Sequence, residues 1–532
     1  MSDPAKIKQL FDPKLSKRLS EDELLLGLVD YGLFCEKLPD CFSSEGLLGS
    51  LESDELEVLD TTNANELKSR LDNRVHDFIP FQAIRDINIP RHMGIPHPES
   101  HVVQALAIKK HWDLLCEHFE KPWPKKSRIY VRRVGQGRIF KMNYKGWDQD
   151  ENEETDLRNE SGALFKVKAD VSSCFPSIYT HSIPWALHGK KMGKSCRSLK
   201  LAGNLIDACT RNTRDKQTNG IAIGPHSSNI ISEIVLTKVD DELVKGGYSR
   251  FTRHIDDYEF FADSLEDAEG FLRLLAFRLR DFELNLNERK TSTLPLPLPS
   301  NEGWLNKLKA FQFPSKKEIG FDSVRNFLDL AVDEANRVGS SAPLNYAFRC
   351  MPVNLSTRAK RLFTIKSCNL ALSFPYLASF VDELVFARFY SKEFRVLIAD
   401  FSTKLARVSL AKVYPQCASI SLYLAIKYNV KVNMGINELS EIRTLEDCVT
   451  NTLLYEYAKT HQIPSLLQKL EKMANALKKQ SSVVQDRQWL FVYHLWDEKV
   501  LSDHGQRFLS KLKAIDYKFY RTPTLRRNKD AS

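Results

Sequence analysis

Hydrophobic and polar positions alternate in two short stretches of the chain, and this alternation predicts β-strands. In residues 165–169 apolar residues alternate with lysines, which predicts a strand that ends at Asp170 and leads into a helix. In residues 251–262 two apolar, aromatic runs flank Asp256 and Asp257, which predicts a β-hairpin with two adjacent carboxylates in its turn. The pattern therefore places three acidic side chains at the ends of predicted strands.

After about residue 315 the spacing of apolar residues becomes helical and stays so. Residues 322–339 and 465–477 each show an apolar stripe with a candidate cap at its start. Strand-like patterns are nearly absent there, and no repeat has a fixed period, which favours irregular, HEAT-like helix pairs. We expect an α+β chain of two domains, residues 1–315 and residues 316–532, the second of them all-α.

The first 160 residues look irregular, with clustered prolines and many charges. Residues 89–98 predict an extended strap, because a residue that precedes proline is biased out of the helical region. Residues 101–119 predict one helix. An acidic stretch at residues 148–156 predicts a loop that ends this region.

A basic stretch with interleaved aromatic residues lies between the helix and the acidic loop. Its break at Gly135-Gln136-Gly137 predicts a hairpin with one cationic face. Such a face could bind the phosphates of a nucleotide or of a nucleic-acid strand, and the alternative is a solvated basic hairpin. The candidate phosphate-binding residues are Arg128, Arg132, Arg138 and Lys141.

Residues 219–229 form a glycine-proline loop that leads into a helix with an apolar face at residues 230–235. Gly220 and Gly224 would let the backbone approach a nucleotide or base pair closely. The start of the helix would offer amide donors to an anion. The loop alone is a weak signal, and its position between the two acidic elements strengthens it.

Composition adds limits rather than a function. A chain of 532 residues with 42% hydrophobic and 27% charged residues is globular and long enough for two or three domains. Its net charge of +9 is compatible with a polyanionic partner but does not require one. The ten cysteines include no C-x-x-C pair, which favours reduced core thiols over a zinc site. No stretch predicts an export signal or a membrane span, so we expect a cytoplasmic protein that binds no membrane.

The chemistry expected from the sequence is metal-dependent phosphoryl transfer. If the two acidic elements are neighbours in an antiparallel sheet, Asp170, Asp256 and Asp257 could bracket two Mg²⁺ or Mn²⁺ ions about 4 Å apart. Phe175 would then lie where the sugar of a nucleotide sits over the metal site. The alternative for Asp256 and Asp257 is an ordinary solvated turn.

These segments resemble the palm of reverse transcriptases. Asp170-Val-Ser-Ser-Cys-Phe175 resembles motif A, and Asn219-Gly-Ile-Ala-Ile-Gly-Pro225 resembles motif B. His254-Ile-Asp-Asp257 resembles motif C, and residues 284–291, with Lys290, resemble motif D. Two positions depart from the pattern: His254 stands where an aromatic residue is usual, and Asn219 stands where glutamine is usual.

A narrower resemblance is to the bacterial abortive-infection (Abi) reverse transcriptases, the AbiK-like group. It rests on Tyr179-Thr-His-Ser-Ile-Pro-Trp185 with Gly189-Lys190, and on similar segments at residues 31–34, 89–90 and 487–493. The resemblance implies fingers and a palm followed by stacked helical repeats. It also implies polymerisation of dNTPs without a template, a single-stranded DNA product attached to a protein tyrosine, a homo-oligomer, and a role in phage defence.

The resemblance also implies roles for single residues. Asp170 and Asp256 would hold the two Mg²⁺ ions, supported by Asp257 and by the backbone carbonyl of Val171. Phe175 would screen the 2′-position of the sugar, and Lys290 would protonate departing pyrophosphate. The motif B residues expected at the nucleotide are Asn219, Gly220, Gly224 and Pro225.

No priming tyrosine can be aligned from the family, so the candidates come from expected flexibility. An acceptor must reach the metal site and retract as the product grows, which favours segments outside the palm. Tyr31, beside Gly32, is the first candidate, and Tyr517 and Tyr520 in a basic C-terminal tail expected to be disordered come next.

Two other functions remain open at this point. One is a template-copying, RNA-directed DNA polymerase of retron or intron type, although no separate RNA-binding or endonuclease module is evident after Lys290. The other is a non-enzymatic helical interaction protein with a degenerate palm. The presence of Asp170, Asp256 and Asp257 argues against it, because converging unpaired acids are costly without a cation.

Overall fold

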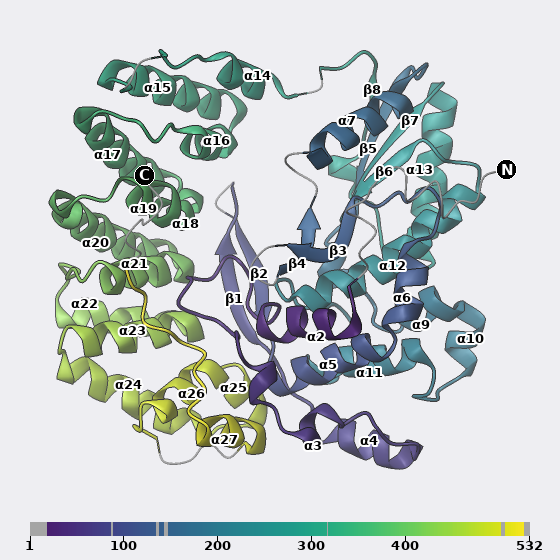
Figure 1. Cartoon of the computed structure of the whole chain (residues 1–532), viewed down its shortest axis with the longest axis horizontal. Helices are drawn as coiled ribbons and strands as arrows, with labels where there is room; N and C mark the ends of the chain where they lie inside the picture. Colours follow the sequence, from purple (N-terminus) through teal and green to yellow (C-terminus); the bar gives the residue numbers. More distant parts are fainter. Residues whose placement is uncertain are drawn as a thin grey trace. The chain divides into compact units, whose positions relative to one another are not determined.

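A computed structural model describes residues 19–86, 89–134, 138–142, 147–299, 301–315, 318–501 and 506–525 (Figure 1). The chain divides into two compact units. Unit 1 comprises Met1–Cys35, Ser44–Phe78 and Gly94–Leu298, and unit 2 comprises Glu36–Ser43, Ile79–Met93 and Pro299–Ser532. The domain boundary that we expected between residues 315 and 316 stays a prediction. The two units separate after Leu298, and unit 2 also includes two segments from the N-terminal part of the chain.

Unit 1 is built around a four-stranded antiparallel sheet with the strand order β6-β7-β5-β8. The predicted strand before Asp170 is β5, and the predicted hairpin is β6 and β7. Both predictions are confirmed, and the two elements are neighbours in the sheet. The strands are β5 (Phe165–Asp170), β6 (Phe251–His254), β7 (Asp257–Ala262) and β8 (Ser292–Pro295).

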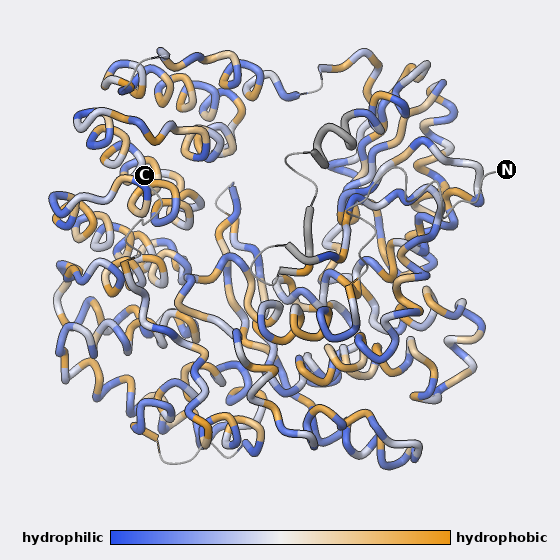
Figure 2. Tube along the Cα trace, viewed as in Figure 1, coloured by the Kyte–Doolittle hydropathy of each residue, from blue (hydrophilic) through white to orange (hydrophobic). Residues whose placement is uncertain are grey.

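Two long helices of unit 1 bury their apolar sides against the elements of the sheet. In α13 (Leu265–Arg280) Ser264 caps the first turn by accepting from the Asp267 N–H, and Phe271 and Leu275 are fully buried. Phe271 stacks on Phe260 of β7 with ring centroids 4.3 Å apart. In α12 (His226–Lys245) the predicted apolar residues 230–235 are buried, and Figure 2 shows the hydrophobic positions along these helices.

The N-terminal part of unit 1 is more regular than the sequence suggested. The expected helix over residues 101–119 is two helices that break at His111, and the expected acidic loop at residues 148–156 lies within a helix. Pro98 lies at the first position of α5, where a proline is compatible with a helix because its missing N–H needs no partner there. The remaining helices of unit 1 are α2 (Glu21–Asp30), α3 (Ser53–Leu56), α4 (Ala64–Asp72), α5 (Pro98–Lys110), α6 (Trp112–Phe119), α7 (Trp147–Glu160), α8 (Cys174–Ser177), α9 (Ser182–His188), α10 (Lys190–Ser195) and α11 (Ala202–Asn212).

The predicted basic hairpin is confirmed as β3 (Ile129–Val134) and β4 (Arg138–Met142), which pair antiparallel. Residues 135–137 between the strands lie outside the described residues, as do the side chains of Arg138 and Lys141. The predicted strap is also extended: β2 (Pro90–Ile95) forms a two-stranded sheet with β1 (Ile79–Ile84).

Unit 2 consists mainly of helices that follow one another along the chain, and no strand occurs in its described residues after 318 (Figure 1). The N-terminal segment of unit 2 is tied into it, because the Ile84 N–H donates to Gln416 and Asp86 accepts from the Ser341 N–H at 2.8 Å. A mixed α+β chain that continues into helices is therefore confirmed, while HEAT-like pairing stays a prediction. The helices are α14 (Gly303–Ala310), α15 (Phe321–Val338), α16 (Ala342–Cys350), α17 (Thr357–Ser373), α18 (Ala378–Val381), α19 (Ala387–Phe389), α20 (Arg395–Lys412), α21 (Pro415–Lys427), α22 (Ile436–Glu441), α23 (Cys448–Thr460), α24 (Pro464–Leu477), α25 (Ser482–Asp486), α26 (Trp489–Asp497) and α27 (Arg507–Ala514).

The C-terminal segment up to residue 525 is not the disordered tail that we expected. Tyr517 is 9% exposed and Tyr520 is 6% exposed, and the Tyr493 hydroxyl donates to the Tyr517 carbonyl. The buried aromatic residues at 517, 519 and 520 anchor the segment in unit 2, where Phe42 pairs with Tyr520. Tyr517 and Tyr520 are thus poor candidates for a mobile acceptor.

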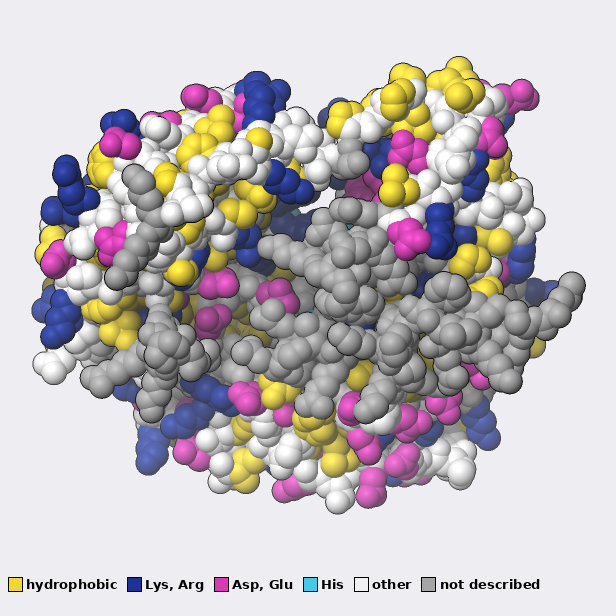
Figure 3. Space-filling view, turned by 45° about the horizontal axis from the view of Figure 1, so that its top comes forward, with side chains coloured by type: hydrophobic (Ala, Val, Ile, Leu, Met, Phe, Trp, Pro, Cys, Tyr) yellow, Lys and Arg dark blue, Asp and Glu magenta, His cyan; other side chains and the backbone are white. Residues whose placement is uncertain are grey.

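The described helices include none that is both long and apolar enough to cross a membrane. Figure 3 shows side chains of both charges interspersed on the face that it displays. On the described part of that face, the excess positive charge is not gathered into one large patch.

Candidate active site

The three acids expected at the strand ends come together in unit 1. Asp170, the last residue of β5, lies opposite Asp257, the first residue of β7, in the antiparallel register. The N–H of Val171 donates to the carbonyl of Asp256 at 3.1 Å, which fixes the backbone of the turn against the end of β5. The pairing of β5 with β7 therefore brings Asp170 beside the Asp256-Asp257 turn, as the sequence predicted.

Asp170 is held by two side chains from the segment that resembles motif D. Lys290 Nζ lies 2.8 Å from Asp170 Oδ1, and Asn287 Nδ2 donates to Asp170 Oδ2 at 2.8 Å. The Asn287 N–H also donates to the Asp170 carbonyl. Burial opposes the charged form of Asp170, which is 7% exposed, but Lys290 and Asn287 outweigh burial and hold the pKa of Asp170 below its usual value.

Asp257 has the opposite shift. The protein atoms that crowd its carboxylate, then the charge of Asp256 and then Asp170, raise the pKa of Asp257 to about 6. Two ionised carboxylates oppose the ionisation of a third one beside them unless a cation lies among the three. Carboxylate and carbonyl oxygens are the ligands that Mg²⁺ and Mn²⁺ take, so this donor set fits a divalent cation.

The segment that carries Phe175 is hydrogen-bonded to the glycine loop. Phe175 is half-buried in the short helix α8, and its carbonyl accepts from the Ile221 N–H at 2.9 Å. The Gly220 N–H donates to the Ile178 carbonyl at 2.7 Å. The segments that resemble motifs A and B are thus tied together by backbone hydrogen bonds, which places Phe175, Asn219 and Gly220 side by side.

The glycine at position 220 is required by its surroundings. Its φ of +83° lies in the left-handed region, and a Cβ there would meet the Pro176 carbonyl oxygen at 2.5 Å. The same Cβ would lie 2.6 Å from Arg214 Nη1, which donates to the Asn219 carbonyl. Gly224 also has a positive φ, of +131°, just before Pro225, which precedes α12.

Tyr31 is not in a flexible segment, which corrects the reason for choosing it. It is half-buried at the C-terminal end of α2, and its N–H donates to the Leu28 carbonyl. The neighbouring Gly32 carbonyl accepts from the N–H of His226, the first residue of α12, at 3.0 Å. Tyr31 therefore lies one residue from a contact with the helix that follows the glycine loop.

Two of the predicted phosphate-binding cations, Arg128 and Arg132, have partners of their own. Arg128 forms a hydrogen-bonded ion pair with Asp156 of α7, and the Arg132 guanidinium lies 5.7 Å from the ring centroid of Tyr130. The backbones of Lys141 and Tyr130 are paired in the hairpin. The break at Gly135-Gln136-Gly137 predicted the hairpin, but the sequence could not show that Asp156 pairs with Arg128.

Sequence reasoning missed Asn287 and a buried charge network below the turn. Arg253 is 0% exposed, and its guanidinium contacts Glu233 and Asp240 of α12. A charged residue within the apolar run 251–255 was the available signal, because a buried arginine requires acidic partners. Glu233 and Asp240 were the second signal: they are seven residues apart, on one face of the predicted helix, and could both pair with a buried arginine.

No protein-family model and no curated protein matches the sequence. Solved structures similar to the chain include the apo telomerase of Candida tropicalis, with 9% identity, a TM-score of 0.33, and coverage of 73% of this chain and 69% of that one. The telomerase of Candida albicans in complex with a fragment of telomeric RNA is similar with 13% identity, a TM-score of 0.27, and coverage of 77% of this chain and 66% of that one. At these scores the similarity carries no conclusion about function, which must rest on the site itself.

Proposed function

We propose that this chain is a nucleotidyltransferase of reverse-transcriptase type that polymerises dNTPs at Asp170, Asp256 and Asp257. The observation that carries the proposal is the register of β5 and β7, which sets Asp170 opposite Asp257. A solvated Asp-Asp turn, the simpler alternative, would not explain a third carboxylate from a different strand. Nor would it explain why the pKa of Asp257 rises to about 6.

In this proposal Asp170, Asp256, Asp257 and the Val171 carbonyl would hold two Mg²⁺ or Mn²⁺ ions. Such ions supply charge stabilisation at the transferring phosphoryl group and orient the attacking and leaving oxygens. Asn287 fixes the rotamer of Asp170 through its side-chain hydrogen bond. Lys290, at the same carboxylate, is the residue that can release a proton to pyrophosphate.

The surface beside the acids would receive the nucleotide. Phe175 would exclude a 2′-hydroxyl, and the backbone of Asn219, Gly220, Gly224 and Pro225 would lie against the base or sugar, in a loop whose shape depends on the positive φ angles of the two glycines. Arg128, Arg132, Arg138 and Lys141 remain proposed phosphate ligands. For Arg128 this requires that phosphate displace Asp156.

The finer proposal is synthesis without a template, primed on a tyrosine, in defence against phage. It rests on the resemblance of residues 179–190 to the Abi group. Tyr31 stays the proposed acceptor, now because it adjoins the helix of the glycine loop rather than because it is flexible. A homo-oligomer and a cytoplasmic location belong to the same proposal.

The test is incubation of the purified protein with each dNTP and Mg²⁺ or Mn²⁺, without added nucleic acid. The proposal expects a labelled product that migrates with the protein until protease is added. Nuclease digestion and mass spectrometry should then find a nucleotide on Tyr31, which Tyr31→Phe removes. A product that forms only with a primer-template and runs free of protein would instead support the template-copying polymerase. Absence of incorporation under all these conditions would contradict both.

The defence role has a separate test in bacterial cells that express the chain. Phage plating on cells with the wild-type chain should fall relative to cells with Asp256→Asn at equal expression. Equal plating on both strains, with incorporation confirmed in vitro, would leave a polymerase without this role.

A further inference from the structure

The turn that carries Asp256 and Asp257 contains a residue in an unfavourable backbone conformation. Ile255 has a φ of +56°, in the left-handed region. A β-branched residue rarely adopts this region, because its Cβ crowds the following carbonyl oxygen. The surroundings must therefore stabilise this conformation, and the acids that follow depend on it because Ile255 sets the direction in which the chain leaves β6.

The side chain that contacts this strained residue is Arg253. Its Nη1 donates to the Ile255 carbonyl at 2.8 Å, so the guanidinium reaches beneath its own hairpin and binds the peptide that joins Ile255 to Asp256. A charged donor makes a stronger hydrogen bond than a neutral one. This bond fixes the orientation of the peptide directly before the first carboxylate of the turn.

Arg253 is itself fixed by two acids of α12. Its Nε lies 3.0 and 2.9 Å from the two carboxylate oxygens of Asp240, and its Nη1 lies 3.1 Å from Glu233 Oε2. Arg253, Glu233 and Asp240 are 0%, 3% and 1% exposed. Both carboxylates project from the same face of α12 and bind the guanidinium group, so its orientation is fixed.

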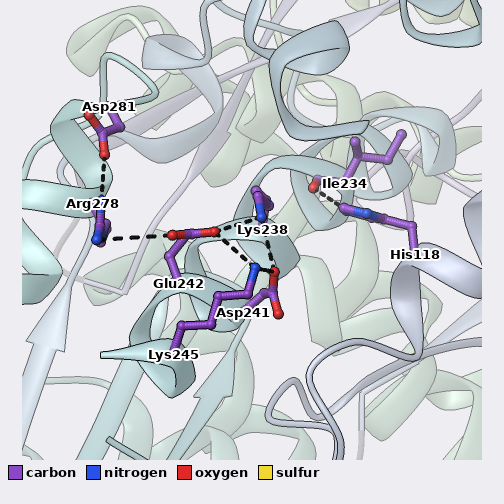
Figure 4. Close-up of polar contacts among 8 residues, drawn as sticks. All are labelled: His118, Ile234, Lys238, Asp241, Glu242, Lys245, Arg278 and Asp281. Carbon is purple, nitrogen blue, oxygen red and sulfur yellow. Dashed lines mark hydrogen bonds and ion pairs between the residues drawn. The ribbon is translucent and has the colours of Figure 1, made fainter. Parts of the chain in front are cut away.

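The helix that carries these acids is fixed on its other side as well. Figure 4 shows Lys238 and Lys245 in ion pairs with Asp241 and Glu242, and Arg278 of α13 near Glu242. His118 of α6 contacts the Ile234 carbonyl at 2.7 Å. Because α12 begins at the end of the glycine loop, it is a rigid link between that loop and the network under the turn.

We propose that Arg253 is a positioning residue: supported by Glu233 and Asp240, it holds Ile255 in the left-handed conformation and thereby aims Asp256 and Asp257 at the metal ions. This inference rests on the proposed function in that the acids bind divalent cations. It adds that their geometry is set from α12, the helix that leads away from the nucleotide loop.

The test measures Mn²⁺ binding by electron paramagnetic resonance, with the binding that persists in Asp256→Asn subtracted. Arg253→Lys keeps the positive charge but cannot hold Asp240, Glu233 and the Ile255 carbonyl at once. It should weaken Mn²⁺ binding about tenfold or more, while Arg273→Lys, the same chemical change at an exposed ion pair with Glu269 on α13, should leave it unchanged. Wild-type affinity in folded Arg253→Lys would overturn the proposal.

A rescue experiment separates positioning from general stability. Glycine adopts a positive φ without cost, so Ile255→Gly in the Arg253→Lys background should restore part of the Mn²⁺ affinity. A merely structural role for Arg253 gives no such recovery, and its absence would contradict the proposal. If Arg253→Lys does not fold, the combination Glu233→Gln, Asp240→Asn and Arg253→Gln removes all three charges together, so that none of the three is left buried without its partners. That variant, folded, should show the same loss of Mn²⁺ affinity, and unchanged affinity would overturn the proposal.

Failure of this proposal and failure of the polymerase proposal give different results. A wild-type protein that binds Mn²⁺ through Asp256, loses the binding in Arg253→Lys and incorporates no nucleotide would retain the positioning role and lose the polymerase. If the wild-type protein incorporates nucleotides and Arg253→Lys equals it in turnover and in Mn²⁺ affinity, the polymerase proposal is retained and the positioning role is lost.

Discussion

The ammonium of Lys290 lies 2.8 Å from Asp170 Oδ1, and the lysine side chain is 56% exposed while that of Asp170 is 10% exposed. The exposed lysine thus contacts a largely buried carboxylate from the solvent side. In the proposed function, Lys290 would offset the charge of Asp170 before a metal ion binds and would then turn toward the leaving group. One contact would therefore affect both metal binding and proton transfer.

Substitution of Lys290 should separate these two effects. Lys290→Met should lower turnover by about 10²–10⁴-fold, because the general acid is lost, and should also lower the Mg²⁺ concentration for half-maximal activity, because no ammonium competes for Asp170. Lys290→Arg is the control: it keeps the charge but cannot release a proton. Wild-type turnover in Lys290→Met, measured over a Mg²⁺ titration, would rule out the acid role.

Phe175 should set the preference for deoxynucleotides. Phe175→Ala removes the ring that would clash with a 2′-hydroxyl, so the ratio of ribonucleotide to deoxynucleotide kcat/KM should rise about tenfold or more. Phe175→Tyr keeps the ring and should keep the ratio. If the ratio is the same in Phe175→Ala, the ring belongs to the core and not to the nucleotide site.

Gly220→Ala should damage the nucleotide loop. The new Cβ would lie 2.5 Å from the Pro176 carbonyl oxygen at a φ of +83°, so the loop must move away from Phe175. We expect a higher KM for dNTPs with little change in the metal requirement. Gly303→Ala is the matched control, because no heavy atom lies within 4 Å of its added Cβ. An unchanged KM in Gly220→Ala would remove the loop from the proposed site.

Buried His101 should make unit 1 sensitive to acid. Burial lowers the pKa of His101 from 6.5 to about 4, although its hydrogen bond to the Leu28 carbonyl opposes the shift. A depressed folded-state pKa means that the stabilisation is complete above pH 6.5 and is lost as the pH falls toward 4. The wild type should lose about 3 kcal/mol more than His101→Gln across this window, as measured by denaturant unfolding. Parallel pH profiles for the two proteins would contradict this account.

The elements that could be predicted from the sequence are those whose signals lie within a few neighbouring residues. The strand at residues 165–170, the hairpin around Asp256 and the glycine loop all carry short-range signals, namely alternation, an acidic turn and Gly-Pro spacing. Their assembly was also predictable, because an antiparallel pairing of the two acidic elements was the simplest way to bring Asp170 beside Asp257.

Long-range partners could not be predicted in the same way. Nothing near Arg253 in the sequence identifies Glu233 and Asp240, since only the fold brings α12 beneath the hairpin. The same holds for Asp156 at Arg128. The basic composition of the C-terminal tail wrongly predicted disorder, because residues such as Tyr520 are buried in the core. Tertiary packing, not local propensity, decides these positions.

The central claim is that the carboxylates at the ends of β5 and β7 hold the ions for nucleotide incorporation. The most direct test is the rate of labelled dNTP incorporation by Asp256→Asn beside Asp263→Asn. Asp263 directly follows the opposite end of β7 and is 69% exposed, so the control makes the same chemical change beside the same strand. With both variants folded, we predict wild-type incorporation in Asp263→Asn and a loss of about 10³-fold or more in Asp256→Asn. Incorporation by Asp256→Asn within about tenfold of the wild-type rate would contradict the account.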